Sequence, residues 1–221
     1  ARRLKDKLEL PAAFSRAEIK GPYLNFFIDR AKFSAQVVSG ILEGGLEAGK
    51  AGVKPETVIV EYSSPNIAKP LHVGHLRNIS IGHALELLYR HLGYNVTTID
   101  HLGDWGTQFG FVYAGCELWG KPVDATIEAL VGLYVRASSL RKAQEENKVP
   151  AEDAGKPDVN QMARDYFKRL EAGESQAMEF WKWCLYVSMN YFEAVYRRLG
   201  VRFDHHNGEA FYRDMIPEVE E

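Results

Sequence analysis

The sequence predicts an α/β fold with parallel strands, and three features of residues 57–99 support this prediction. An apolar, β-branched run at residues 57–62 has the composition of a strand covered on both faces of a parallel sheet. An amphipathic run follows to about residue 92, and a second β-branched run occupies residues 95–99. Strand, helix and strand within about 45 residues favour a right-handed βαβ crossover. Ligands of such sheets bind beyond the carboxyl ends of the strands.

The loop after the first strand ends on two histidines, His72 and His75, which lie three residues apart with Gly74 between them. We expect them on the first turn of a helix over about residues 72–92. Unpaired N–H groups and the positive end of the helix dipole attract phosphate to such a turn. Side chains at this spacing share a face, and a glycine lets a nucleotide ring approach the backbone. The loop therefore predicts an ATP site for chemistry at a phosphate.

Composition excludes several classes of function. The 221 residues carry a net charge of −3, so bulk charge gives no sign of DNA or other nucleic-acid binding, although a local basic patch stays possible. Cys116 and Cys184 are far apart and have no metal-ligand spacing, which is typical of a reducing compartment such as the cytoplasm. We interpret the adjacent His205 and His206 as surface residues and expect no bound metal. No apolar run approaches the length of a membrane span, so we expect no membrane partner.

Two domains are expected, at residues 1–50 and 51–221. In the first, residues 23–28 predict a strand and residues 29–42 a helix, before a glycine-rich linker. We interpret this segment as the end of a small domain. The chain begins and stops within charged helical sequence, so we expect it to be a piece of a longer protein.

The second domain becomes helical after about residue 120. The pattern predicts helices at residues 123–143, 161–171 and 176–199, followed by a third strand at residues 201–204. The last helix is rich in aromatic residues, a stripe that indicates core packing more than base stacking.

The tract at residues 103–110 is punctuated by glycine and has two interpretations. It can be a tight turn in which Asp104 caps a helix and Trp105 packs in the core. It also follows the second strand on the predicted ligand side, so it can contribute to the site.

Several stretches together resemble the arginyl-tRNA synthetases of class I. The strand and loop with His-x-Gly-His resemble the first nucleotide-binding motif of that class, the HIGH motif, which small adenylyltransferases also share. The longer stretches resemble this family in particular; they are residues 63–70, 103–110, 198–204 and 208–212. Residues 21–27 are similar to the end of the family's added N-terminal domain.

This resemblance implies the first half of a class I Rossmann-like nucleotide-binding fold with a helical insertion at about residues 120–198. A remnant of a small α+β, tRNA-binding domain would precede it. The implied reaction activates arginine with ATP, with Mg²⁺ arriving through ATP, and attaches it to tRNA(Arg) by way of arginyl-adenylate.

The resemblance also implies roles for residues at the phosphates. His72 and His75 would donate hydrogen bonds to phosphate oxygens as charge shifts towards pyrophosphate. Gly74 would admit the adenosine, and Lys69 would add a full positive charge; the alternative for Lys69 is a solvated loop lysine.

The arginine would be held by three further residues. Glu61 is a carboxylate within an apolar strand, a costly place without a cation, and the resemblance makes it a contact of the guanidinium. Ser64 and Asn66 would hold the α-amino and carboxylate ends. The alternatives are an outward-facing glutamate and ordinary turn chemistry around Pro65.

The chain lacks the second half of the family's catalytic domain, so we expect weak or no aminoacylation by this segment alone. His83 stands where many relatives carry an acidic residue. Two alternatives stay open: a small nucleotidyltransferase that shares the histidine motif, and a non-catalytic paralogue that binds ATP or a partner.

Overall fold

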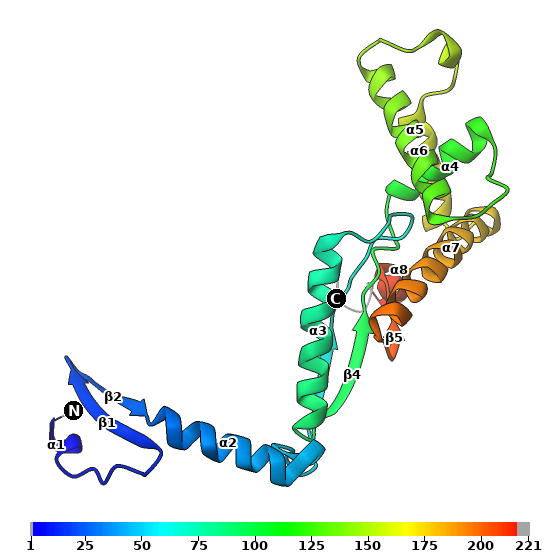
Figure 1. The fold of residues 1–221 in the computed structure, drawn as a ribbon. Helices are drawn as coiled ribbons and strands as arrows, with labels where there is room; N and C mark the ends of the chain where they lie inside the picture. The colour runs from blue at the N-terminus through cyan, green and yellow to red at the C-terminus, as the bar shows by residue number, and fades with distance from the viewer. Residues whose placement is uncertain (1, 216–221) are drawn as a thin grey trace. The chain divides into compact units, whose positions relative to one another are not determined.

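A computed structural model describes residues 2–215, and these fall into two compact units (Figure 1). The first takes in the chain up to Lys54 together with His91–Gly93, and the second comprises Pro55–Arg90 and the chain from Tyr94 onwards.

The first unit contains a hairpin and a helix. Its elements are α1 (Arg2–Lys5), β1 (Phe14–Lys20), β2 (Tyr23–Ile28), α2 (Arg30–Gly44) and the short 3₁₀ helix η1 (Gly45–Glu47). The predicted strand and helix are confirmed, and the Asp29 side chain caps α2 by accepting the Lys32 N–H at 3.2 Å. The antiparallel partner β1 was not predicted, because its residues are mostly polar and form no apolar run.

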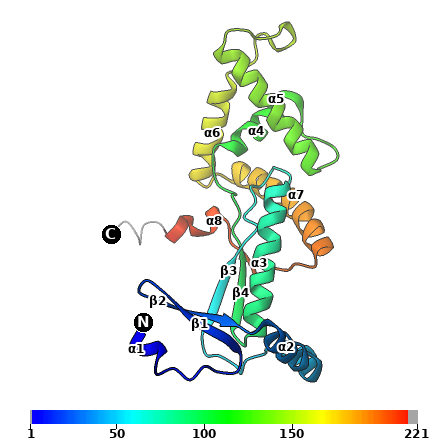
Figure 2. The same ribbon diagram turned by 60° about the vertical axis from the view of Figure 1, so that its left-hand side comes forward.

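The second unit holds a parallel sheet in the order β3-β4-β5; Figure 1 shows β4 and β5, and Figure 2 shows β3 beside β4. Strand β3 (Thr57–Glu61) is followed by α3 (Val73–His91) and then by β4 (Asn95–Asp100), so the predicted α/β arrangement is confirmed. The prediction that β3 is buried on both faces was wrong. Its side chains alternate between half-buried and exposed, and Ile59 is 64% exposed.

The third strand lies later than predicted, at β5 (His205–His206). Asp204 explains the shift, because its carboxylate accepts the Thr98 N–H at 2.8 Å and occupies the place of a strand carbonyl. The preceding residues pack instead of pairing. Val201 is buried, and the Phe203 ring lies 4.5 Å from that of Tyr62.

The rest of the second unit is helical (Figure 2). Its elements are α4 (Gln108–Trp119), α5 (Ile127–Glu145), η2 (Ala151–Asp153), α6 (Val159–Glu171), α7 (Ser175–Leu199), α8 (Glu209–Tyr212) and η3 (Arg213–Met215). Helix α4 packs against α5 and α6, and α6 against α7. The three predicted helices are confirmed within four residues at each end.

Helix α4 agrees with the interpretation of residues 103–110 as a turn before a helix, but its bounds were not predicted, and two glycines within it explain why. Glycine lowers helix propensity, but here it permits close packing of helices. A Cβ atom on Gly110 would lie 2.4 Å from the Ala163 carbonyl oxygen of α6, and one on Gly115 would lie 3.0 Å from Leu133 Cβ of α5.

The aromatic stripe of α7 is core, as predicted, except for Tyr186, which is 67% exposed. Phe192 and Tyr196 are buried, and Phe180, Trp181 and Trp183 pack against the same core. Among the described residues, no helix is both long and apolar enough to cross a membrane.

Candidate active site

The loop between β3 and α3 has an unusual backbone that contacts two other segments. Ser63, Ser64 and Ala68 adopt positive φ angles of 74°, 51° and 57°, which non-glycine residues rarely do. The Gly103 N–H donates to the Pro65 carbonyl at 2.9 Å, and the Ile67 N–H donates to the Gly103 carbonyl at 3.2 Å. The loop therefore continues the sheet by pairing with the chain that leaves β4.

Helix α7 anchors the same loop from its other side. The Ala68 N–H donates to the Ser188 hydroxyl at 2.8 Å, and the Ser63 and Tyr196 hydroxyls lie 2.7 Å apart. Because α7 ends the helical insertion, residues more than a hundred positions downstream fix the conformation of this loop.

The two predicted histidines lie together at the start of α3, with ring centroids 3.9 Å apart. The Gly74 N–H donates to His72 Nδ1 at 3.1 Å, and the His72 N–H donates to His75 Nδ1 at 3.1 Å. The prediction of unpaired N–H groups here therefore needs correction, because the imidazoles themselves cap these two.

The caps assign the protonation state of both rings. A ring nitrogen that accepts an N–H carries no proton, so the proton of each neutral imidazole lies on Nε2. Burial lowers the pKa of His75, and the neighbouring His72 lowers it further. Asp100 has a smaller effect that raises it. The pair thus supplies two neutral Nε2–H donors.

Packing against His72 also explains why residue 74 is a glycine, in addition to the predicted approach of a nucleotide ring. A Cβ atom at this position would lie 2.9 Å from His72 Cε1. A side chain at Gly74 would therefore push the His72 ring out of its capping position.

Lys69 points towards the helical insertion. It is half-buried, and its Nζ lies 5.8 Å from the centroid of the Tyr134 ring in α5. This places the ammonium next to an aromatic face and argues against a wholly solvated lysine.

The structure brings Glu61 close to Ser64, whose hydroxyl donates to Glu61 Oε1 at 3.5 Å. Glu61 is exposed, so the argument from a costly buried carboxylate was wrong. Its contact with a guanidinium stays a prediction. Asn66 is exposed too, and its side chain lies against Gly103, where an added Cβ would come 2.1 Å from Asn66 Oδ1.

The tract at residues 103–110 forms a structural junction. Asp104 does not cap α4, because that helix begins after Thr107. Asp104 Oδ1 accepts the Ala210 N–H at 2.9 Å, and its main-chain carbonyl accepts the Trp181 indole N–H at 2.7 Å. Trp105 packs against Trp181, in line with the core interpretation. Burial raises the pKa of the Asp104 carboxyl.

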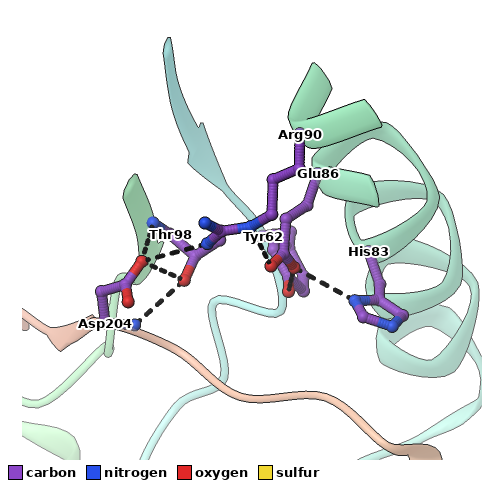
Figure 3. A network of polar contacts seen from close by, with 6 residues as sticks. All are labelled: Tyr62, His83, Glu86, Arg90, Thr98 and Asp204. Atoms are coloured by element: carbon purple, nitrogen blue, oxygen red, sulfur yellow. Dashed lines mark hydrogen bonds and ion pairs between the residues drawn. The ribbon is translucent and has the colours of Figure 1, made fainter. Parts of the chain in front are cut away.

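Sequence reasoning missed the polar network that ties α3 to the sheet (Figure 3). Glu86 of α3 accepts from the Tyr62 hydroxyl at 2.8 Å and from Arg90 Nε at 2.9 Å, and its Oε2 lies 3.1 Å from His83 Nδ1. Arg90 also lies 3.5 Å from Asp204. His83, Glu86 and Arg90 are spaced so that they lie on one face of a helix. An acidic residue among the apolar positions of this helix was the feature of the sequence that could have indicated the network.

A second buried network joins Asp100, Tyr196 and His206. Asp100 is fully buried at the end of β4, and its Oδ2 accepts from the Tyr196 hydroxyl at 2.9 Å and lies 3.2 Å from His206 Nδ1. No sequence pattern indicated this network, because Tyr196 and His206 lie 96 and 106 residues after Asp100.

Comparison with known proteins agrees with this architecture. A family model described as "tRNA synthetases class I (R), catalytic domain" matches residues 36–221, which assigns the class. An arginine–tRNA ligase of Halothermothrix orenii is 41% identical over 223 residues, covering 99% of this chain and 37% of the relative. The chain belongs to the arginyl-tRNA synthetase family of class I tRNA synthetases.

Solved structures give the same fold. The arginyl-tRNA synthetase of Thermus thermophilus matches with a TM-score of 0.56 and 26% identity, over 94% of this chain and 32% of that one. That of Plasmodium falciparum matches with a TM-score of 0.62 over 96% of this chain and 36% of that one; at 21% identity it bears on the fold alone. The chain spans about 37% of the length of the arginine–tRNA ligase of Halothermothrix orenii.

Proposed function

We propose that this chain supplies the first half of the ATP and arginine sites of an arginine–tRNA ligase. The observation that carries the proposal is the pair of Nε2–H donors at His72 and His75, held by backbone caps at the start of α3. The family relationship supplies the choice of arginine and tRNA(Arg) as substrates.

In the first step, a carboxylate oxygen of arginine attacks the α-phosphorus of ATP. The new bond joins that oxygen to phosphorus, and the bond to the bridging oxygen of the β-phosphate breaks, so pyrophosphate leaves. The protein forms no bond, and its contribution is positioning and charge stabilisation. The arginyl group then passes to a ribose hydroxyl of the terminal tRNA nucleotide, and AMP leaves.

Charge at the phosphates would come from several sources. His72 and His75 would act as hydrogen-bond donors, and Lys69, together with Mg²⁺ that arrives with ATP, would supply positive charge. The described residues hold no group of three or more His, Cys, Asp or Glu side chains placed to bind a metal.

The arginine would lie at the carboxyl end of β3. Glu61 is exposed there and next to Ser64, so its charge is available to a guanidinium. Ser64 and Asn66 would bind the amino and carboxylate ends. We further propose that residues 1–50 are part of a tRNA-binding domain and that the protein acts in the cytoplasm.

The test is arginine-dependent ATP–pyrophosphate exchange, with and without tRNA(Arg). It is run on this chain and on the longest protein that carries it. We expect exchange by the longer protein and little or none by the chain alone. Exchange with a different acyl substrate would favour the small nucleotidyltransferase. ATP binding without any exchange in the longer protein would favour the non-catalytic paralogue.

A further inference from the structure

Two adjacent serines leave β3 in a conformation that their own side chains do not favour. Ser63 and Ser64 have φ angles of 74° and 51°, and neither is glycine. Such a pair persists only where its surroundings hold it in place, and backbone strain of this kind gathers at functional sites. We call residues 63 and 64 the serine strap.

A single buried carboxylate holds the strap. Asp100 lies at the end of β4 with no exposed surface, and its Oδ1 accepts the Ser64 N–H at 3.2 Å. Its Oδ2 accepts the Tyr196 hydroxyl at 2.9 Å. Because a phenol has one proton, Tyr196 then accepts from the Ser63 hydroxyl, 2.7 Å away. Asp100 therefore reaches both serines, one directly and one through Tyr196.

The donors around Asp100 keep the carboxylate satisfied. His206 Nδ1 lies 3.2 Å from Oδ2, so it acts as a third donor. Burial, and then the charge of Asp100, raise the pKa of Tyr196, which keeps its hydroxyl protonated as the donor that this arrangement requires. Three donors therefore satisfy this buried side chain.

We propose that Asp100 and Tyr196 are positioning residues for the amino acid, because they fix the serine strap in the geometry that binds the α-amino and carboxylate ends. This inference rests on the proposed function of Ser64. Asp100 is fully buried, so it acts through the strap and does not touch substrate. His72 and His75 have their own caps on α3, so ATP binding is expected to be insensitive to the strap.

The test compares Asp100→Ala, Asp100→Asn and Tyr196→Phe in the longest protein that carries this segment. We expect Asp100→Ala to raise the KM for arginine about tenfold in pyrophosphate exchange, with the KM for ATP changed less than about twofold. Asp100→Asn keeps an oxygen for the Ser64 N–H and should restore the KM for arginine to within about threefold of wild type. Tyr196→Phe should fall between the two.

Tyr166→Phe is the matched control. The Tyr166 side chain is also buried and donates one hydrogen bond, to the Ala177 carbonyl at 3.0 Å, but this bond joins α6 to α7 and does not involve the serine strap. It should lower stability about as much as Tyr196→Phe and leave both KM values unchanged. If Tyr196→Phe changes the KM for arginine no more than this control, or changes both KM values equally, the proposal is wrong. This pair decides the matter even if Asp100→Ala does not fold.

Amide hydrogen exchange gives a readout that needs no activity. The Ser64 amide should be protected in the wild type and in Asp100→Asn and should lose most of its protection in Asp100→Ala, with Tyr196→Phe in between because its direct bond to Asp100 remains. A Ser64 amide that exchanges equally in all variants would overturn the positioning role. A wild-type protein that shows this protection but no arginine-dependent exchange would instead contradict the proposed function alone.

Discussion

Each imidazole at the start of α3 is both a cap and a donor. Nδ1 accepts a backbone N–H, which leaves the ring proton on Nε2 as the donor. Spacing in the sequence predicted that His72 and His75 share a face. It could not predict the caps, because these depend on side-chain rotamers that only the folded loop selects.

The tautomers give a first prediction. The His72 and His75 rings should carry their proton on Nε2 at neutral pH, while His206, whose Nδ1 faces the Asp100 carboxylate, should carry its proton on Nδ1. Long-range ¹H–¹⁵N correlation of the ring nitrogens distinguishes these forms. Nδ1-protonated or doubly protonated rings at His72 and His75 would contradict the cap assignment.

Loss of a donor gives a second prediction. His72→Ala or His75→Ala should lower the rate of arginine-dependent exchange by about 10²–10³ in the longest protein that carries this segment. The physical reason is that each removes one donor to the charge that develops on the phosphates. His205→Ala, on the exposed strand β5, is the control and should change the rate less than about twofold. A loss below threefold in the first two variants would count against their role.

Among the elements, β3, β4, α3 and α7 were predicted within two residues because their apolar patterns are local. β5 was misplaced because it has only two residues, and its neighbour Asp204 replaces strand pairing with a side-chain bond. The contacts that hold the candidate site join β4 to α7 across 96 residues, so no local pattern reveals them.

The network that ties α3 to the sheet gives a third prediction. Glu86 is 7% exposed and pairs with Tyr62, His83 and Arg90. Glu86→Ala should lower the free energy of unfolding by about 2 kcal/mol, because it leaves the buried Tyr62 hydroxyl without an acceptor and removes a partner of the partly exposed His83 and Arg90. Urea unfolding followed by circular dichroism measures the change.

Glu193→Ala is the matched control, because Glu193 and Arg197 repeat the i,i+4 pairing of Glu86 and Arg90 on an exposed helix face. Its effect should stay below about 0.5 kcal/mol. Equal losses in the two variants would show that the network on α3 contributes no more than a surface ion pair.

The ionisation of the Glu86 carboxyl should make the stability of the fold depend on pH. Burial raises the pKa of Glu86, but hydrogen bonds from Tyr62, His83 and Arg90 outweigh it and hold the pKa below the ordinary 4.5. A group with a lowered folded pKa stabilises the fold fully above its unfolded pKa, and this stabilisation is lost as the pH falls through the folded value. The stability gap between wild type and Glu86→Gln should therefore shrink as the solution is acidified below pH 4.5. A gap that stays constant would contradict the charged network.

At the scale of the whole molecule, charge is unevenly divided. Residues 1–44 hold 8 Lys and Arg against 5 Asp and Glu, whereas the full chain carries a net charge of −3. The phosphates of an RNA backbone bind Lys and Arg side chains. The excess of positive charge in residues 1–44 therefore supports the proposed contact of this segment with tRNA.

Deletion of residues 1–44 tests that role. The deletion stops there because Ala48 and Lys54 bond to the end of α3 and the turn that follows it, through His91 Nε2 at 2.9 Å and the Gly93 carbonyl at 2.8 Å. Affinity for tRNA(Arg) should fall about tenfold, with a weaker dependence on salt, because phosphate contacts are lost. ATP affinity, measured by titration on the same protein, should change less than about threefold, since His72, His75 and their caps are retained. An unchanged tRNA affinity would remove residues 1–44 from the tRNA interface, and an equal loss of ATP affinity would show that the deletion disturbs the second unit.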